Sequence, residues 1–318
     1  MHLKNNQILT LQLLEGIGPA AIKALDSYIC DNEVAVENTS DLWDVMQKAI
    51  PGKVKKITYD DIVSQTTAAQ RIIDASLQKD IKLLGCWDKD FPEMLKNVTD
   101  EEGKSKPCVL LFYKGNLDAM KKPGFAIIGT REPDEDGLKA GPYFAHALAQ
   151  QGLNIVSGLA LGCDTMAHRG ALDVGGTTTA FLAHGLDSVY PPENESLAEE
   201  IVANGGLLLS EYPIGTTVSR YNLVARDRLQ SALSKACLVI ETGLNGGTMH
   251  AARATLAANK TLYVVDYSDK SGDAKKGNEW LVTKGAKRLT SKDDIAKIAE
   301  EIKAVGDRNT NPQMDLFA

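Results

Sequence analysis

The chain has 318 residues, of which 43% are hydrophobic and 24% are charged, a balance that excludes an intrinsically disordered protein. Its 35 Lys and Arg residues against 42 Asp and Glu residues give a formal net charge of -7, which excludes a protein that coats nucleic acid by bulk charge alone. No apolar run approaches the ~18 residues of a membrane helix, and the start lacks a secretory signal, so we expect a cytoplasmic protein with no membrane partner.

The first 80 residues predict a small all-helical domain. Residues 9–14 form an apolar stretch, residues 15–19 read Glu-Gly-Ile-Gly-Pro, and a helical pattern resumes over residues 20–28. Helix, glycine-rich turn and helix is the layout of a helix-hairpin-helix, as in SAM-like domains, and a proline suits the start of the second helix. The turn amides hold a DNA phosphate in such hairpins. The alternative is a tight turn inside a helical bundle, because the turn contains no basic residue.

From residue 81 to residue 306, short apolar runs alternate with longer amphipathic stretches. This alternation predicts an α/β domain, with a mostly parallel Rossmann-like sheet and helices on both faces. The expected strands are residues 109–113, 125–128, 154–156, 178–182, 207–209, 237–240 and 262–265. The expected helices are residues 138–151, 165–174, 196–204, 226–235 and 248–258.

Several of these strands end in glycine-rich turns that open a helix. Glycine lets backbone amides approach an anion, and a helix start adds partial positive charge. Ligands of such sheets bind at the carboxyl ends of the strands, so the turns predict a phosphate-binding pocket there. The alternative is that the glycines only permit tight turns. The candidate residues are Gly129, Thr130, Arg131, Ser157, Gly158, Gly162, Asn245, Gly246, Gly247 and Thr248.

Arg220, Arg226 and Arg228 form the densest arginine cluster in the chain. We expect phosphate contacts from them at the mouth of the pocket, although Arg226 and Arg228 diverge by ~200° on a regular helix. The alternative is ion pairing with Asp227 or neighbouring acids. Tyr212 or Tyr221 could stack on a base, and packing is an equal alternative for each.

Asp164 and His168 lie four residues apart and would share one helix face. An acid–base pair is conceivable, but a capping aspartate and a structural histidine are the preferred interpretation. His184 and Glu241, at strand ends, could line the pocket as polar contacts. The acidic run at residues 132–136 is more typical of a solvated loop than of a metal site.

Several stretches of this sequence resemble a known protein family. Residues 127–131 read Ile-Ile-Gly-Thr-Arg, and residues 157–172 read Ser-Gly-Leu-Ala-Leu-Gly-Cys-Asp-Thr-Met-Ala-His-Arg-Gly-Ala-Leu. Together with Trp-Asp-Lys-Asp-Phe-Pro at residues 87–92, they resemble the DNA processing protein A (DprA/Smf) family over about residues 81–290. Where the family has Arg-Asn-Arg, this chain has Arg226-Asp227-Arg228, and no winged-helix domain is expected after residue 306. The resemblance therefore indicates a divergent member.

The resemblance implies an extended Rossmann-like domain that binds single-stranded DNA, usually as a homodimer. Members load a RecA-type recombinase onto DNA during recombination or transformation and are not known as hydrolases. A binding protein without a cofactor is therefore expected. The alternative is a nucleotide-binding or nucleotide-hydrolysing enzyme of the Lonely-guy type, because Gly246-Gly247-Thr248 distantly resembles its phosphate loop. Residues 249–252, Met-His-Ala-Ala, lack the nearby catalytic glutamate of those enzymes.

The last residues, 307–318, are predicted to form a flexible tail. Within it, Gln313-Met314-Asp315-Leu316-Phe317 resembles the pentapeptide by which bacterial proteins bind the replication sliding clamp. In that pattern Gln313 supplies hydrogen bonds, and Leu316 and Phe317 enter an apolar groove. The alternative is a tail that folds back onto the body.

The five cysteines are widely spread and form no CxxC pair. This spacing indicates neither a disulfide framework nor a thiolate zinc site, so we expect reduced thiols and no metal. They are Cys30, Cys86, Cys108, Cys163 and Cys237.

Overall fold

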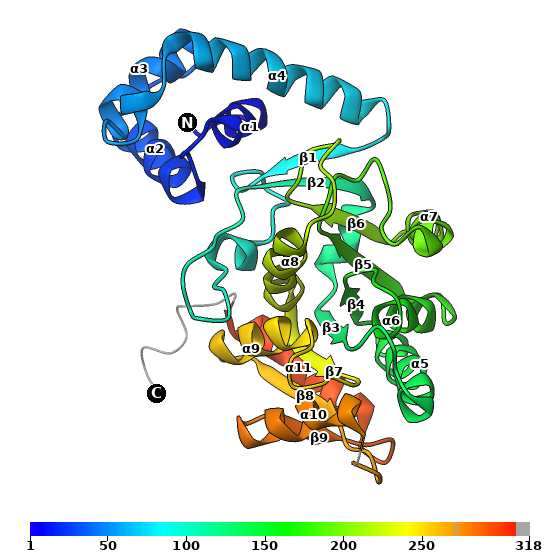
Figure 1. The fold of residues 1–318 in the computed structure, drawn as a ribbon. Coiled ribbons are helices and arrows are strands. Elements are labelled where there is room, and N and C mark those ends of the chain that lie inside the picture. Colours follow the sequence, from blue (N-terminus) through cyan, green and yellow to red (C-terminus); the bar gives the residue numbers. More distant parts are fainter. Residues whose placement is uncertain (271, 310–318) are drawn as a thin grey trace.

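A nine-stranded sheet forms the centre of the computed structural model, which describes residues 1–270 and 272–309 (Figure 1). The strand order is β1-β2-β6-β5-β4-β3-β7-β8-β9. β1 and β2 pair antiparallel with each other and β2 pairs antiparallel with β6, whereas the other neighbours are parallel. The strands are β1 (Lys82–Gly85), β2 (Leu110–Gly115), β3 (Gly124–Ile128), β4 (Asn154–Ser157), β5 (Thr177–Leu182), β6 (Leu207–Ser210), β7 (Ser234–Val239), β8 (Thr261–Val265) and β9 (Lys287–Leu289).

Helices cover both faces of this sheet, as expected for an extended Rossmann-like fold. Along β3, Phe125 and Ile127 pack toward α5, α6 and α11, whereas Ala126 and Ile128 pack toward α9 and α10. This alternation follows from the pleat of a strand buried on both faces. The helices of this domain are α5 (Glu135–Gln150), α6 (Cys163–Leu172), α7 (Glu195–Ala203), α8 (Arg220–Leu233), α9 (Thr248–Ala257), α10 (Asp273–Thr283) and α11 (Ile295–Asn309), with short 3-10 turns at Glu93–Asn97, Leu117–Lys121 and Pro192–Asn194.

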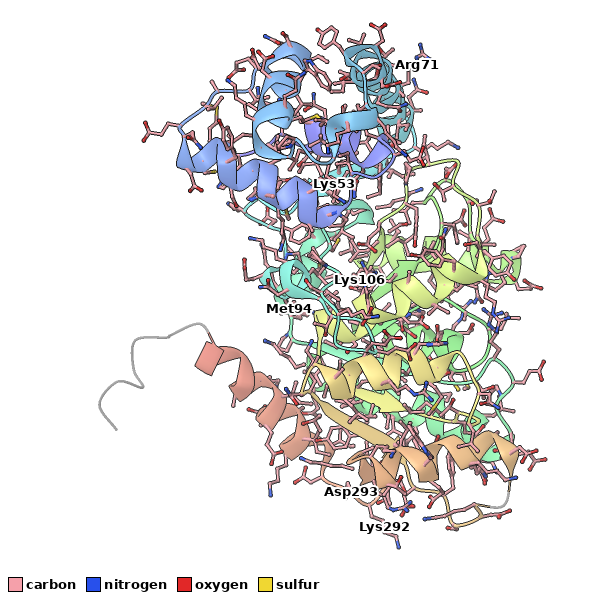
Figure 2. The ribbon with its side chains drawn as sticks, turned by 60° about the vertical axis from the view of Figure 1, so that its left-hand side comes forward. Lys53, Arg71, Met94, Lys106, Lys292 and Asp293 are labelled. Atoms are coloured by element: carbon pink, nitrogen blue, oxygen red, sulfur yellow. The ribbon has the colours of Figure 1, made fainter. Side chains whose placement is uncertain are left out.

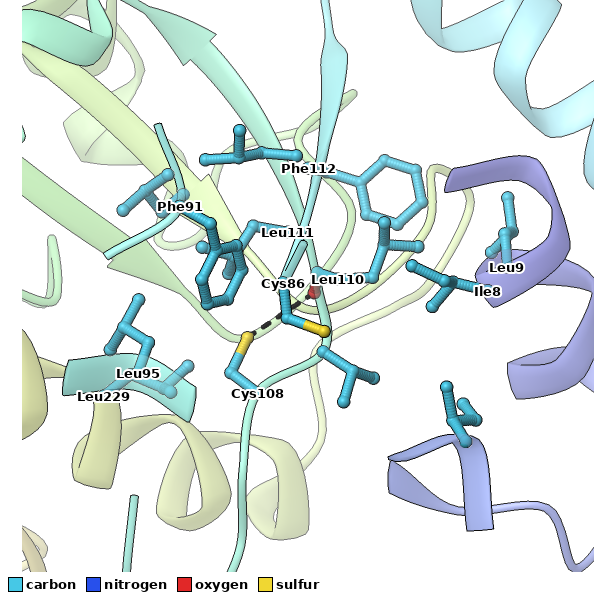
Figure 3. Packing of buried hydrophobic residues seen from close by; sticks show 14 of the residues in the cluster. Ile8, Leu9, Cys86, Phe91, Leu95, Cys108, Leu110, Leu111, Phe112 and Leu229 are labelled. Carbon is cyan, nitrogen blue, oxygen red and sulfur yellow. Dashed lines mark hydrogen bonds between the residues drawn. The ribbon is translucent and has the colours of Figure 1, made fainter. Parts of the chain in front are cut away.

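Four helices precede the sheet, and the first and the fourth of them pack against its β1–β2 edge. Figure 3 shows Ile8 and Leu9 of the first helix facing Leu110 and Phe112 of β2. Asn5 also donates a hydrogen bond to Asp88, after β1, at 2.7 Å. The helices therefore share one core with the sheet edge. They are α1 (Asn5–Leu13), α2 (Pro19–Asp31), α3 (Thr39–Ala49) and α4 (Tyr59–Leu77), with a 3-10 turn at Val54–Lys56.

The expected strands and helices of the sheet domain are present with shifts of a few residues, but four elements were not expected. β1 and β9 are short and half exposed, so they lack a continuous apolar run. α10 and α11 carry apolar residues on one face only. α11 reaches Asn309, so the first residues of the expected tail are helical. Residues 310–318, including Gln313, Leu316 and Phe317, lie outside the described residues.

Within residues 1–270 and 272–309, no helix is long and apolar enough to span a membrane.

Candidate nucleic-acid interface

A pocket of about 520 Å³ opens at the carboxyl ends of β3 and β7, between α6, α8 and α9. We call it the arginine pocket, because Arg131, Arg220 and Arg226 line it. Turns that are far apart in the sequence meet here. The turn after β3 contributes Gly129, Thr130 and Arg131, and the turn after β7 contributes Thr242, Gly243, Asn245, Gly246, Gly247 and Thr248.

Arg226 forms the inner wall of the arginine pocket. It is only 4% exposed, and its Nε lies 3.5 Å from Oδ1 of Asp227. Neither its Nε nor its Nη1 has a hydrogen-bond partner among the described residues. Buried guanidinium donors normally bind an acceptor, because leaving them unpaired costs free energy. Arg226 is therefore a buried cation that has Asp227 as a neighbour but keeps two donor atoms without a hydrogen-bond acceptor among the described residues.

Three of the predicted glycines position the arginines by permitting close packing. A Cβ atom on Gly158 would overlap Nη1 of Arg226, and one on Gly129 would overlap the Cys163 side chain at the start of α6. Gly162 has a φ of +72°, and a Cβ there would lie 2.5 Å from the carbonyl oxygens of Thr130 and Arg131. The sequence interpretation had these glycines present amides to an anion. In the structure they also bring the Arg131 turn and the Arg226 guanidinium into place, and their contact with an anion stays a prediction.

Ser157 does not line the arginine pocket. It is fully buried, and its hydroxyl donates to the carbonyl oxygen of Ile127 at 2.7 Å, which joins β4 to β3. The amide of Thr130 is likewise occupied, because it donates to the carbonyl oxygen of Glu241 at 2.7 Å. These two residues hold the strand ends together, so we leave Ser157 out of the proposed contact set.

The N-terminus of α9 faces the pocket without a side-chain cap. Gly247 occupies the N-cap position, and no side chain in the described chain accepts a hydrogen bond there. Gly246, Gly247 and Thr248 all line the pocket. The amides of Met249 and His250 donate to the carbonyl oxygens of Gly246 and Gly247, and the positive end of this ten-residue helix favours an anion. The residues with predicted phosphate contacts therefore line one side of the pocket, and the contacts themselves stay a prediction.

The two carboxyl groups of the pocket are weaker acids than usual because they are buried. Burial raises the pKa of Asp227 to about 6 and raises the pKa of Asp164 above its ordinary value. Asp164 accepts hydrogen bonds from the amides of Gly158 and Ala160 at 3.1 and 3.3 Å. Three arginines facing two weakened acids make the pocket net positive near neutral pH.

Arg228 lies outside the arginine pocket, which agrees with its divergence from Arg226 on a helix. Its guanidinium pairs with Glu211 at 2.8 Å and donates to the carbonyl oxygen of Lys106 at 3.2 Å. It lines a second cavity, together with Met94. Figure 2 labels Met94 and Lys106 on the segment beside α8. Arg228 therefore forms an ion pair, as the alternative interpretation of the arginine cluster proposed.

The two buried histidines have local hydrogen-bond partners. Nδ1 of His168 lies 2.6 Å from the Thr178 hydroxyl, and burial lowers its pKa to about 3. Nδ1 of His184 lies 2.9 Å from the carbonyl oxygen of Gly185. Asp164 accepts hydrogen bonds from the loop before α6 and, within the described residues, forms no hydrogen bond with His168. The structural interpretation of Asp164 and His168 therefore fits the geometry.

Glu241 lies beside a polar cluster at the start of α5. Its Oε2 accepts a hydrogen bond from the Asp134 amide at 2.9 Å. Asp134 also caps α5, and Lys275 of α10 pairs with Asp134 and Asp136 at 3.0 and 2.7 Å. Burial raises the pKa of Glu241 to about 7. The acidic run therefore caps a helix and binds a lysine.

One face of α8 contributes pocket residues that the sequence interpretation missed. Leu223, Val224 and Gln230 line the pocket together with Arg220 and Asp227. Their spacing follows the three- and four-residue period of one helix face. We expected this helix to begin at residue 226, whereas it begins at Arg220 behind Ser219, whose side chain accepts a hydrogen bond from the Asn222 amide. Ser219 was the available signal for the earlier start.

The known proteins that this chain resembles identify its family. The family model of DNA recombination-mediator protein A matches residues 82–300. The chain belongs to this family. It is 32% identical over 291 residues to Protein Smf of Synechocystis sp., covering 89% of this chain and 69% of that protein. It is 33% identical over 228 residues to DNA processing protein DprA of Streptococcus pneumoniae, covering 71% of this chain and 78% of that protein.

Solved structures agree with the family and with the fold. The crystal structure of DprA from Streptococcus pneumoniae superposes with a TM-score of 0.74 at 27% identity, covering 96% of this chain and 98% of that one. A DprA structure from Helicobacter pylori, described for its single-stranded DNA binding mode, has a TM-score of 0.59 at 29% identity and covers 71% of this chain and 96% of that one. The expected family and the Rossmann-like fold are therefore confirmed.

Proposed function

We propose that the arginine pocket binds the sugar-phosphate backbone of single-stranded DNA. The observation that carries this proposal is Arg226, a buried guanidinium whose Nε and Nη1 have no hydrogen-bond partner in the described chain. A phosphate oxygen supplies the acceptors that these donors need. In this proposal Arg131 and Arg220, which are exposed and line the same pocket, contact neighbouring phosphates.

Apolar side chains around the pocket favour a single strand over a duplex. Tyr221 is 79% exposed on the first turn of α8, next to Arg220, and Val224 is exposed one turn later. Leu161 and Leu244 are also exposed, on the loops before α6 and α9. Unpaired bases stack on such surfaces, whereas a duplex keeps its bases inside. A recessed phosphate site beside apolar groups therefore suits a flexible single strand.

The family and this site together support a role as a recombination mediator. In our proposal the chain holds single-stranded DNA and helps to load a RecA-type recombinase onto it, acting as a homodimer. The binding role requires no bond-breaking chemistry and no cofactor. With a purified RecA-type recombinase, the protein is expected to raise strand-exchange activity on DNA precoated with a single-strand-binding protein. The Arg226→Met variant is expected to lose this stimulation.

The DNA-binding claim is tested by fluorescence anisotropy with labelled oligo-dT. The Arg131→Ala and Arg220→Ala variants should each bind about ten-fold or more weakly, because each loses a charge-assisted contact of at least ~1.4 kcal/mol. Arg71→Ala is the matched control, since Arg71 is an exposed arginine on α4, far from the sheet helices (Figure 2). Equal affinity in all three variants would contradict the proposal. Release of free base from nucleoside monophosphates would instead support the enzyme alternative.

The C-terminal peptide gives a separate proposal that rests on its sequence alone. We propose that Gln313, Leu316 and Phe317 dock on the replication sliding clamp. This contact would bring the mediator to sites of DNA synthesis. It is independent of the arginine pocket, and the two are separable by mutation.

A further inference from the structure

His2, Asp26 and Cys30 bring three metal-ligand atoms together at the N-terminus of the chain. Nδ1 of His2 lies 2.8 Å from Oδ2 of Asp26 and 3.4 Å from Sγ of Cys30, and this Sγ lies 3.9 Å from the same carboxylate oxygen. All three atoms lie within 4.8 Å of one another. Asp26 and Cys30 are one turn apart on α2, so they project side by side toward His2.

These distances fit a tetrahedral ion. Ligand atoms on tetrahedral Zn²⁺, with Zn–N bonds of ~2.0–2.1 Å and Zn–S bonds of ~2.3 Å, lie about 3.3 to 3.6 Å apart. The observed separations of 2.8, 3.4 and 3.9 Å bracket these values, so shifts of about half an ångström would suffice. One imidazole, one thiolate and one carboxylate form a donor set that suits Zn²⁺.

The surroundings hold the donors in place. The His2 ring stacks on Trp87, with centroids 5.8 Å apart and an angle of 12° between the planes. Asp26 uses its other oxygen, Oδ1, to accept a hydrogen bond from the Leu3 amide at 2.8 Å, which leaves Oδ2 for the cluster. The carbonyl oxygen of Met1 lies 3.2 Å from the Cys30 Sγ, so this oxygen or a water is available as a fourth ligand. Orienting contacts of this kind are typical of metal sites.

We propose that His2, Asp26 and Cys30 bind a structural Zn²⁺ ion. The ion would replace the thiol proton of Cys30, which is released to solvent, and would tie the first residues to α2. Through the His2–Trp87 stack it would also join the helical region to the loop after β1. The cysteine spacing could not indicate this site, because its ligands lie 24 and 28 residues apart along the chain.

The site is tested with the full chain, free of any histidine tag and stripped of metal with a chelator. Titration with Co²⁺ should give visible d–d bands and a near-ultraviolet thiolate-to-cobalt band that saturate at one equivalent. Cys30 is the thiol to which that band belongs, because the other four cysteines are buried. Addition of Zn²⁺ should bleach these bands and raise the Tm.

Three variants decide the assignment. Cys30→Ser should lose the thiolate band, and His2→Ala should weaken Co²⁺ binding at least ten-fold, while both keep the metal-free Tm within a few degrees because His2 is half exposed. His146→Ala, at an exposed histidine on α5, should titrate like the unmodified chain. Absence of a thiolate band, or an unchanged titration of His2→Ala, would overturn the proposal. Neither outcome bears on the arginine pocket.

Discussion

Gly158 and Arg226 are fitted to each other: a Cβ atom on the glycine would overlap Nη1 of the arginine. The glycine precedes α6 and the arginine lies on α8, so the helices α6 and α7 and the strands β5 and β6 separate them in the sequence. The space left by the absent side chain is where the guanidinium lies. A glycine after a strand thus leaves room for a buried guanidinium.

The Gly158→Ala substitution should therefore weaken DNA binding by displacing the Arg226 side chain. The added methyl group displaces the guanidinium, so affinity for oligo-dT should fall about ten-fold, as expected for loss of one charge-assisted contact. In a double-mutant cycle with Arg226→Met, the two effects should be far from additive, because both remove the same contact. Gly52→Ala is the control, since a Cβ there meets no atom within 4 Å. Full additivity in the cycle would show that Gly158 contributes by another route.

Arg226→Met separates binding from folding. We expect ~10- to 100-fold weaker binding of oligo-dT, because hydrogen bonds to a charged group contribute about 1.5–3 kcal/mol. The free energy of unfolding should fall by at most about 3 kcal/mol, since an apolar side chain of similar length replaces the arginine while Asp227 loses its ion-pair partner. Urea titration and anisotropy on the same preparation check both values. A large loss of stability together with unchanged affinity would assign Arg226 a purely structural role.

The sequence predicted the sheet and the place of the pocket, because buried parallel strands and glycine turns leave local signals. Phe125–Ile128 and its following Gly129 show both signals within a few residues. It could not predict which glycines contact a ligand, since the role of Gly158 depends on a side chain 68 positions later. The sequence also could not tell which of Arg226 and Arg228 lines the pocket. That depends on which face of α8, a helix that begins at Arg220, lies toward the pocket.

The raised pKa of Glu241 predicts that the free energy of unfolding depends on pH. Burial raises its pKa to about 7 from an ordinary 4.5, so between these values the folded state holds a proton that the unfolded state has lost. Its contribution to stability is therefore complete below pH 4.5 and is lost as the pH rises to about 7. In Glu241→Gln, the fall in unfolding free energy between pH 5 and pH 7.5 should be smaller. The same fall in Glu241→Gln and in the exposed control Glu199→Gln would contradict this assignment.

Residues 313–317 should bind the replication sliding clamp without contributing to DNA binding. Replacing Gln313, Leu316 and Phe317 with alanine should abolish capture of a purified bacterial sliding clamp, because the apolar pair supplies most of the buried surface. Affinity for oligo-dT should stay within two-fold of the unmodified chain. Clamp capture that survives the triple substitution would refute the docking proposal.

The salt dependence of DNA binding tests the arginine pocket most directly. For single strands, the slope of log K against log salt concentration changes by about 0.7 for each phosphate contact. The double variant Arg131→Ala with Arg220→Ala should therefore bind oligo-dT with a slope about 1.4 units shallower than the unmodified chain, whereas Arg71→Ala should keep the original slope. Identical slopes in the double variant and the unmodified chain would mean that these arginines contact no phosphate.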